Sequence, residues 1–166
     1  MILHADRITL RPFEAADLPA VAAMLAEPEV ARWWGDYDED RLRREHLEAP
    51  DSENLVIEVD GQVAGLMLVY DEEEPEYRHA ALDISLATAH HGQGLGRRAL
   101  RLVIDHLVAE RGHHRFTIDP SADNERAIRS YRAVGFRPVG ILRKYWRAPD
   151  GTWRDGLMMD LLAEDL

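Results

Sequence analysis

Three glycines at every second position, Gly92, Gly94 and Gly96, constrain this chain most, because they join a strand-like run to a strongly helical one. Residues 81–87 alternate as a strand does, and the apolar side chains of residues 95–110 recur at helical spacing. A glycine-rich turn before a helix points unpaired backbone N–H groups at one place, where the helix dipole adds positive potential. The junction therefore predicts a strand-turn-helix unit with a site for phosphate or pyrophosphate.

Neither of two familiar phosphate-binding loops fits this stretch. A P-loop requires Gly-Lys-Ser/Thr, but Gly96 is followed by Arg97, and the dinucleotide fingerprint G-x-G-x-x-G requires its third glycine one residue later. A plain tight turn with a glycine cap is the alternative.

The segment from His91 to Arg97 resembles the acetyl-CoA loop of the GNAT superfamily of N-acetyltransferases, Q/R-x-x-G-x-G/A at a strand-to-helix junction. Gly94 and Gly96 fill its two small positions, and His91 stands where Gln or Arg is typical. The downstream residues 116–136 also resemble this family: a strand, a loop ending in Asn124, a helix and a Gly-Phe pair. Local signals agree, since Ser121 or Asp123 can cap that helix.

The resemblance implies an acetyl-CoA cofactor and a general acid, Tyr131, that returns a proton to the CoA thiolate. A core aromatic on the apolar face of its helix is the alternative for Tyr131. Asn124 is expected to hydrogen-bond the pantetheine or diphosphate. The implied cofactor-binding residues are Leu86, Ala87, His91, Gly92, Gln93, Gly94, Leu95, Gly96, Arg97, Asn124, Ala127 and Tyr131.

Asp83 is the candidate general base. Alternation in its strand puts Leu82 and Ile84 on one face and Asp83 on the other, and an aspartate within a strand is disfavoured by propensity. Its place is similar to that of the aspartate near the acceptor amine in aminoglycoside 6'-N-acetyltransferases of this superfamily. A solvent-facing aspartate is the alternative.

A Trp-Trp-Gly segment also resembles those resistance enzymes, in which it forms part of the acceptor site. Adjacent tryptophans cannot both face one core, so at least one is expected to line a cleft. Asp119 resembles a substrate-contacting aspartate, although Asp-Pro is also a common turn former. The implied substrate-binding residues are Trp33, Trp34, Asp36, Tyr77, Asp83 and Asp119.

Charge and cysteine content bound the partners. The 166 residues carry a net charge of -11, which argues against a nucleic-acid-binding module and favours a cationic substrate. Acidic runs at residues 36–40 and 71–76 are expected to rim the acceptor site, with solvated loops as the alternative. The absence of cysteine excludes disulfides and a cysteinyl-acetyl intermediate. The histidine pairs at 90–91 and 113–114 are taken as loop residues, so no metal is expected.

The order of elements resembles that of the whole GNAT fold. The resemblance implies an α+β fold in one domain, residues 1–166, with about six to seven strands in a mixed sheet splayed in the middle and about four flanking helices. Pro28 is expected to end the first helix. Two hairpins are expected, at Asp60-Gly61 and at Asp150-Gly151. The remaining expected segments are strands near 7–13, 54–59, 62–70, 80–87, 115–119, 137–147 and 152–162, helices at 17–26, 95–110 and about 121–134, and a helical or loop region from 30 to 47.

The resemblance therefore implies acetyl transfer from acetyl-CoA to the 6' amine of an aminoglycoside, directly in a ternary complex. The alternatives are a ribosomal-protein-type N-terminal acetyltransferase, a small polyamine acetyltransferase and a non-catalytic CoA-binding module. No apolar run is long enough to cross a membrane and no secretory signal is evident, so we expect a cytoplasmic monomer or homodimer.

Overall fold

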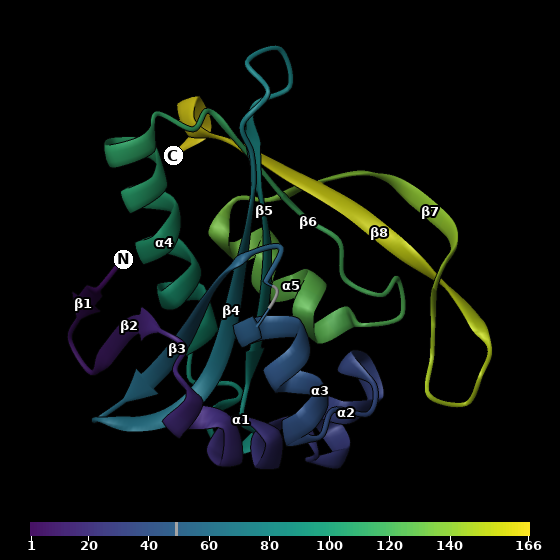
Figure 1. Ribbon diagram of the computed structural model, residues 1–166. Coiled ribbons are helices and arrows are strands. Elements are labelled where there is room, and N and C mark those ends of the chain that lie inside the picture. Colours follow the sequence, from purple (N-terminus) through teal and green to yellow (C-terminus); the bar gives the residue numbers. More distant parts are fainter. Residues whose placement is uncertain (49) are drawn as a thin grey trace.

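A computed structural model describes residues 1–48 and 50–166 of the chain. Their strands form one eight-stranded sheet in the order β1-β2-β3-β4-β5-β6-β8-β7, in which only β5 and β6 pair in parallel (Figure 1). The strands are β1 Leu3–Ala5, β2 Ile8–Pro12, β3 Glu53–Val59, β4 Gln62–Glu72, β5 His79–Leu86, β6 Arg115–Ile118, β7 Arg137–Arg147 and β8 Trp153–Leu162.

Helices cover both faces of the sheet (Figure 1). The predicted α+β fold is confirmed, but the structure has one strand more, β1, and five α-helices rather than about four, because the region from 30 to 47 is divided. The α-helices are α1 Leu18–Leu25, α2 Pro28–Trp34, α3 Glu39–Arg43, α4 Leu95–Arg111 and α5 Glu125–Val134; short helical turns span Ala15–Asp17, Arg44–Glu48, Thr88–His90 and Ala163–Asp165.

Pro28 starts a helix instead of ending one. Helix α1 stops at Leu25, and Pro28 lies in the first turn of α2. Proline suits that position because the first-turn N–H groups of a helix have no intrahelical partner. The predicted stop signal was therefore the start of the next helix.

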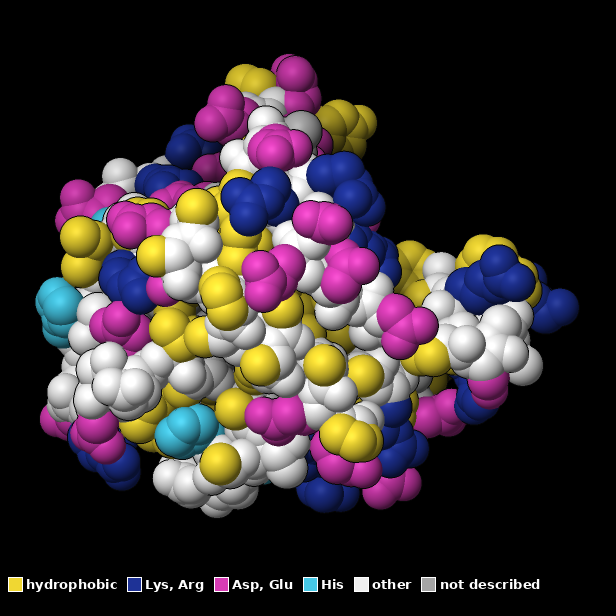
Figure 2. Space-filling view, turned by 60° about the horizontal axis from the view of Figure 1, so that its bottom comes forward, with side chains coloured by type: hydrophobic (Ala, Val, Ile, Leu, Met, Phe, Trp, Pro, Cys, Tyr) yellow, Lys and Arg dark blue, Asp and Glu magenta, His cyan; other side chains and the backbone are white. Residues whose placement is uncertain are grey.

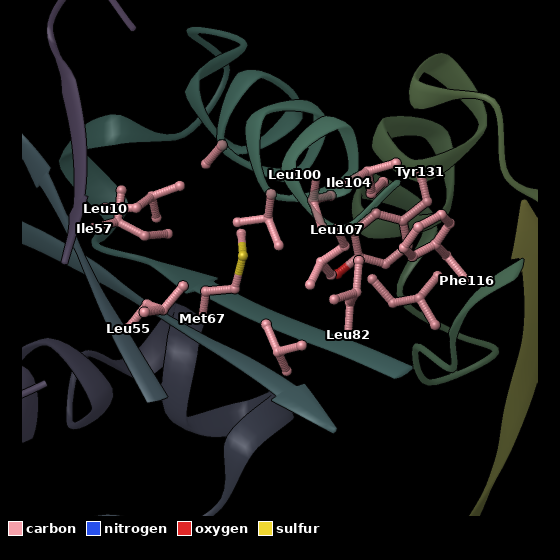
Figure 3. Packing of buried hydrophobic residues seen from close by; sticks show 14 of the residues in the cluster. Leu10, Leu55, Ile57, Met67, Leu82, Leu100, Ile104, Leu107, Phe116 and Tyr131 are labelled. Carbon is pink, nitrogen blue, oxygen red and sulfur yellow. The ribbon is translucent and has the colours of Figure 1, made fainter. Parts of the chain in front are cut away.

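Two apolar cores lie on opposite faces of the sheet. On one face α4 contributes Leu100, Ile104 and Leu107, which pack against Leu82 of β5 and Phe116 of β6 (Figure 3). A second, smaller core lies against α1, α2 and α3. Because strand side chains alternate, the face of β5 opposite Leu82 is free to carry polar groups.

The sheet opens between β5 and β6. These strands are paired only at Ala80 with Phe116 and at Ala81 with Thr117, so the rest of β5 is paired on one side alone. The splay in the middle of the sheet is confirmed. It leaves the end of β5 that leads into the glycine-rich turn open to a ligand.

The last two strands form an arm that extends away from the body of the protein (Figure 1). Its turn contains Gly151 with φ of 82°, and the earlier hairpin turns at Asp60 and Gly61 with φ of 52° and 76°. Both predicted hairpins are confirmed, since paired strands flank each turn.

Gly65 fixes how closely β4 approaches β5. An added Cβ would overlap the backbone oxygen of Ser85 and lie 2.7 Å from Leu86 Cδ2. We expect Gly65→Ala to lower the free energy of unfolding by about 1–3 kcal/mol, because the two strands must separate to admit the methyl group. Urea denaturation measures this loss. Gly140→Ala is the control, since nothing lies within 4 Å of its Cβ, and an equal loss there would contradict the steric explanation.

Candidate active site

The glycine-rich turn at the start of α4 presents a row of backbone amides. Gly92 and Gly94 have φ of 75° and 74°, a conformation that favours glycine. Within residues 1–48 and 50–166, the backbone N–H groups from Gly92 to Arg97 donate no hydrogen bond. Unpaired amides at a helix N-terminus form an anion site, so the turn suits a diphosphate.

Gly96 has a different reason to be glycine. Its added Cβ would lie 3.3 Å from Leu86 Cδ1, so the third glycine allows α4 to pack closely against β5. This contact brings the helix N-terminus next to the open end of β5, where the sheet splays.

A pocket of about 360 Å³ lies in front of this turn. Of the residues predicted to bind the cofactor, those that line it are Leu86, His91, Gly92, Gly94, Leu95, Gly96, Arg97, Asn124, Ala127 and Tyr131. Ala87 and Gln93 do not line it. Ala87 packs against the core beneath α1, and Gln93 donates its side-chain amide to the oxygen of Ala89 at 2.8 Å.

Cationic side chains border the same pocket. Arg97, Arg126 and Arg129 line it, whereas Arg98 pairs with Asp6 and so turns away. Three guanidinium groups beside free amides supply positive potential for several phosphate oxygens.

His91 links the turn to the end of β5. Its Nε2 lies 2.8 Å from the oxygen of Leu86, and burial lowers the pKa of the imidazole. A neutral ring that bonds to the end of β5 holds the start of the turn in place. The His91 side chain therefore makes a structural contact with the backbone of Leu86.

A second pocket, of about 530 Å³, adjoins the first. The residues shared by the two linings are Trp33, Trp34, Ile84, Asn124 and Tyr131. The second pocket is rich in acidic and aromatic side chains, which include Tyr37, Glu45, Asp51, Tyr70, Asp83, Asp119, Tyr145 and Trp146. A ligand in one pocket and a ligand in the other would meet at the shared wall.

Asp83 lies in the wall of the second pocket. It is opposite Leu68 of β4 and on the other face of β5 from Leu82, as its alternation predicted. Burial and then the charge of Asp119 raise the pKa of Asp83 to about 7. A carboxyl group with a pKa near neutrality can both accept and release a proton at physiological pH.

Tyr131 borders both pockets and is also part of the core. It is 7% exposed, and its ring meets that of Phe136 edge-on with centroids 6.2 Å apart. Burial and then the charge of Asp83 raise the pKa of Tyr131, so the phenol stays protonated. The two interpretations of this tyrosine, core aromatic and site residue, are therefore compatible.

Asn124 is the N-cap of α5. Its Oδ1 accepts a hydrogen bond of 3.2 Å from the amide of Ala127, so the predicted cap at Ser121 or Asp123 is wrong. The side-chain NH₂ group of Asn124 can then donate to a ligand while Oδ1 caps the helix.

Several residues of the second pocket were not predicted. Tyr37 donates a 3.0 Å hydrogen bond to Glu45, which Arg41 also contacts at 3.0 Å, and Tyr145 donates to Asp119. Burial raises the pKa of Tyr37 to about 12. Tyr37 lies within the acidic run that follows the tryptophans, but none of the acidic side chains of that run lines the pocket. Nothing in the sequence joins Tyr145 to Asp119.

Asp36 and Tyr77, predicted as substrate-binding residues, do not line either pocket. Tyr77 is 75% exposed in the loop between β4 and β5, and Asp36 contributes its backbone oxygen to Arg41 at 2.8 Å. The acidic side chains of residues 36–40 and 71–76 do not line the pockets either, so the predicted acidic rim is wrong. Figure 2 shows acidic side chains spread over the face that it presents. Within the described ranges, no group of three or more metal-ligating side chains is found, and no helix there is long and apolar enough to span a membrane.

Comparison with known proteins gives one family match. Residues 7–137 match the family model described as acetyltransferase (GNAT) domain. This range contains the glycine-rich turn, β5 and α5, and so most of both pockets.

Relatives align with most of the chain. The spermidine N(1)-acetyltransferase of Escherichia coli (strain K12) is 27% identical over 161 residues, which cover 93% of this chain and 86% of that protein. The aminoglycoside N(6')-acetyltransferase type 1 of Klebsiella pneumoniae is 27% identical over 165 residues, 88% of this chain and 80% of that protein. The structure of Mycobacterium smegmatis RimJ in complex with CoA-disulfide is similar with a TM-score of 0.82 at 25% identity, covering 100% of this chain and 88% of that one.

Proposed function

Because the chain belongs to the acetyltransferase (GNAT) family, we propose that residues 1–166 form one catalytic domain that acetylates the 6' amine of an aminoglycoside. The donor is acetyl-CoA, and the M. smegmatis neighbour holds CoA in its disulfide form. The diphosphate lies on the amides that follow Gly92, and the pantetheine arm runs along the open end of β5 toward Asp83.

One observation carries the choice of acceptor: the second pocket combines four carboxylates with a wall of aromatic rings. The carboxylates are those of Glu45, Asp51, Asp83 and Asp119. Several negative groups favour an acceptor with several ammonium groups, and flat aromatic side chains favour stacking against sugar rings. The volume of about 530 Å³ suits a ring system better than a thin chain.

Transfer occurs directly in a ternary complex. Asp83 takes a proton from the substrate ammonium, and the neutral amine attacks the thioester carbonyl. The C–S bond breaks as the amide forms, Tyr131 donates its proton to the departing thiolate, and the phenolate recovers a proton from the acetylated nitrogen. Asp83 releases its proton to solvent after the products leave.

A polyamine is the second candidate acceptor. The E. coli relative that aligns with 93% of this chain is named as a spermidine acetyltransferase, and the carboxylate-rich pocket is also compatible with such a polycation. An N-terminal peptide has fewer charges to match, so it is less favoured by this pocket.

A coupled assay separates these acceptors. Release of CoA thiol is followed with kanamycin, tobramycin, gentamicin, spermidine and peptides with free N-termini at equal concentrations. We expect the highest kcat/KM with an aminoglycoside. Turnover of spermidine or peptides alone would refute the proposed acceptor, and no thiol release with any amine would favour a CoA-binding module.

Tyr131→Phe is expected to lower kcat by about 10- to 100-fold, because the thiolate then leaves without a proton donor. The KM for acetyl-CoA should stay within about twofold, since the ring keeps its contact with Phe136. Steady-state kinetics measure both values. Tyr77→Phe removes a hydroxyl from an exposed tyrosine outside the pockets and serves as the control. Full activity of Tyr131→Phe would reduce this tyrosine to a packing role.

A further inference from the structure

The arm places one tyrosine hydroxyl on a carboxylate of the acceptor pocket. Tyr145 belongs to β7, and its hydroxyl donates a hydrogen bond to Oδ2 of Asp119, which follows β6. Both residues line the second pocket together with Asp83. The contact joins two segments that are 26 residues apart in the sequence.

Three features of the arm direct Tyr145 to this position. The register between β7 and β8 shifts between Leu142 and Trp146, and within this bulge Lys144 has φ of 49°. The amide of Lys144 donates to Oδ1 of Asp155 at 2.8 Å, which fixes the unusual backbone. A bulge of this kind redirects the side chains next to it.

Gly156 completes the placement. A Cβ added there would lie 2.7 Å from Cδ1 and 3.3 Å from Cγ of Tyr145, so the ring of this tyrosine lies over a position that has no side chain. Backbone, cross-strand glycine and hydrogen bond thus agree on one orientation of Tyr145.

The Tyr145 hydroxyl makes the two acids that face the second pocket, Asp119 and Asp83, unequal in their tendency to ionise. Two neighbouring carboxyl groups oppose each other's ionisation, so one of them tends to keep a proton. Burial raises the pKa of Asp119, whereas the Tyr145 hydrogen bond acts in the opposite direction. A phenol donates best to an ionised carboxylate, and such charge-assisted hydrogen bonds are the stronger ones.

We infer that Tyr145 is a positioning residue that keeps Asp119 ionised and thereby leaves Asp83 as the member of the pair that takes the substrate proton. The inference rests on the proposed function, because it assigns the base of that reaction. Asp119 then holds the substrate ammonium as a permanent anion, and Asp83 changes its protonation state in each turnover.

The other ionisable groups of the second pocket do not take the place of the hydrogen bond from Tyr145 to Asp119. Glu45 is already paired with Arg41 and Tyr37. Burial raises the pKa of the phenols that face Asp83 and Asp119, those of Tyr37, Tyr70 and Tyr131. It lowers the pKa of the His46 imidazole, so all four groups are neutral near pH 7. The titratable groups around the pair are Tyr37, Glu45, His46, Asp51, Tyr70, Tyr131 and Tyr145.

Tyr145→Phe tests the inference through a pH profile. The ring stays over Gly156 while the hydrogen bond is lost, so the doubly ionised pair becomes less stable. We expect the acidic limb of kcat/KM against pH to move up by about one pH unit, which makes kcat/KM about tenfold lower below that limb. The plateau at high pH should stay within about twofold. A purely structural role would lower kcat/KM equally at all pH values.

Gly156→Ala is a second variant that leaves both carboxylates and the hydroxyl in the protein. Its methyl group displaces the ring of Tyr145, so the same shift of the acidic limb is expected. Tyr77→Phe, outside the pockets, is the control and should leave the limb unchanged. An unshifted limb in Tyr145→Phe overturns the inference.

A measurement without substrate separates this inference from the proposed function. Carboxyl carbon NMR of the wild-type protein and of Tyr145→Phe follows the titration of Asp119 and Asp83 directly. We expect the midpoint of Asp119 to rise in the variant. If no amine is acetylated, the proposed function fails, but this titration still decides the role of Tyr145. An unchanged midpoint of Asp119 in Tyr145→Phe overturns the inference.

Discussion

Asp83→Asn is expected to lower kcat/KM by about 10²- to 10³-fold near pH 7.5, the size typical of a lost general base. The pKa of Asp83 is raised to about 7, so its carboxyl group is mostly ionised only at pH values above about 7. The wild-type acidic limb should therefore fall tenfold per pH unit below about 7. In the variant this limb disappears, and the remaining activity rises only as the substrate amine loses its own proton at higher pH. The ratio of the wild-type kcat/KM to that of Asp83→Asn should therefore shrink toward pH 9.

Stability measurements separate this loss from misfolding. Because the pKa of Asp83 is higher in the folded protein than in the unfolded chain, ionisation of this carboxyl group lowers the free energy of unfolding. Replacement by a neutral asparagine should therefore not lower the Tm at pH 8. Asp105→Asn makes the same chemical change on the exposed side of α4, where Asp105 pairs with Arg101 at 2.8 Å. That control should keep full kcat/KM. An unchanged pH profile in Asp83→Asn would exclude Asp83 as the base.

Gly94→Val is expected to weaken CoA binding by about 10- to 100-fold, because a branched side chain cannot adopt φ of 74° and the amides of the turn lose their common direction. The added Cβ also lies 3.2 Å from Nη2 of Arg97 and displaces a guanidinium that lines the cofactor pocket. Isothermal titration calorimetry with CoA measures the effect.

Gly112→Val is the matched control for this change. Gly112 caps the other end of α4 with φ of 66°, and nothing lies within 4 Å of its added Cβ. Both variants carry comparable backbone strain and should lose similar stability. Equal affinity for CoA in the two variants would mean that the turn does not hold the diphosphate.

Much of the local structure was predictable from the sequence because it depends on neighbours along the chain. Alternation placed Asp83 and Leu82 on opposite faces of β5, and helical spacing identified α4. Asp-Gly pairs at 60–61 and 150–151 marked both hairpins. Pro28 was misinterpreted because the same residue type ends one helix and starts another, and only the positions of the neighbouring helices distinguish the two cases.

The sequence by itself determined the glycine-rich turn, the strand that precedes it and the polar face that carries Asp83, since each follows from short-range periodicity and backbone conformation. Only the tertiary structure decided that Tyr145 contacts Asp119 beside Asp83, that Glu45 and Tyr70 share their pocket, and that Tyr77 lies outside it. The reason is physical: distances between side chains on separate strands depend on the register, splay and bulges of the sheet. These are set by packing of the whole chain and leave no local pattern.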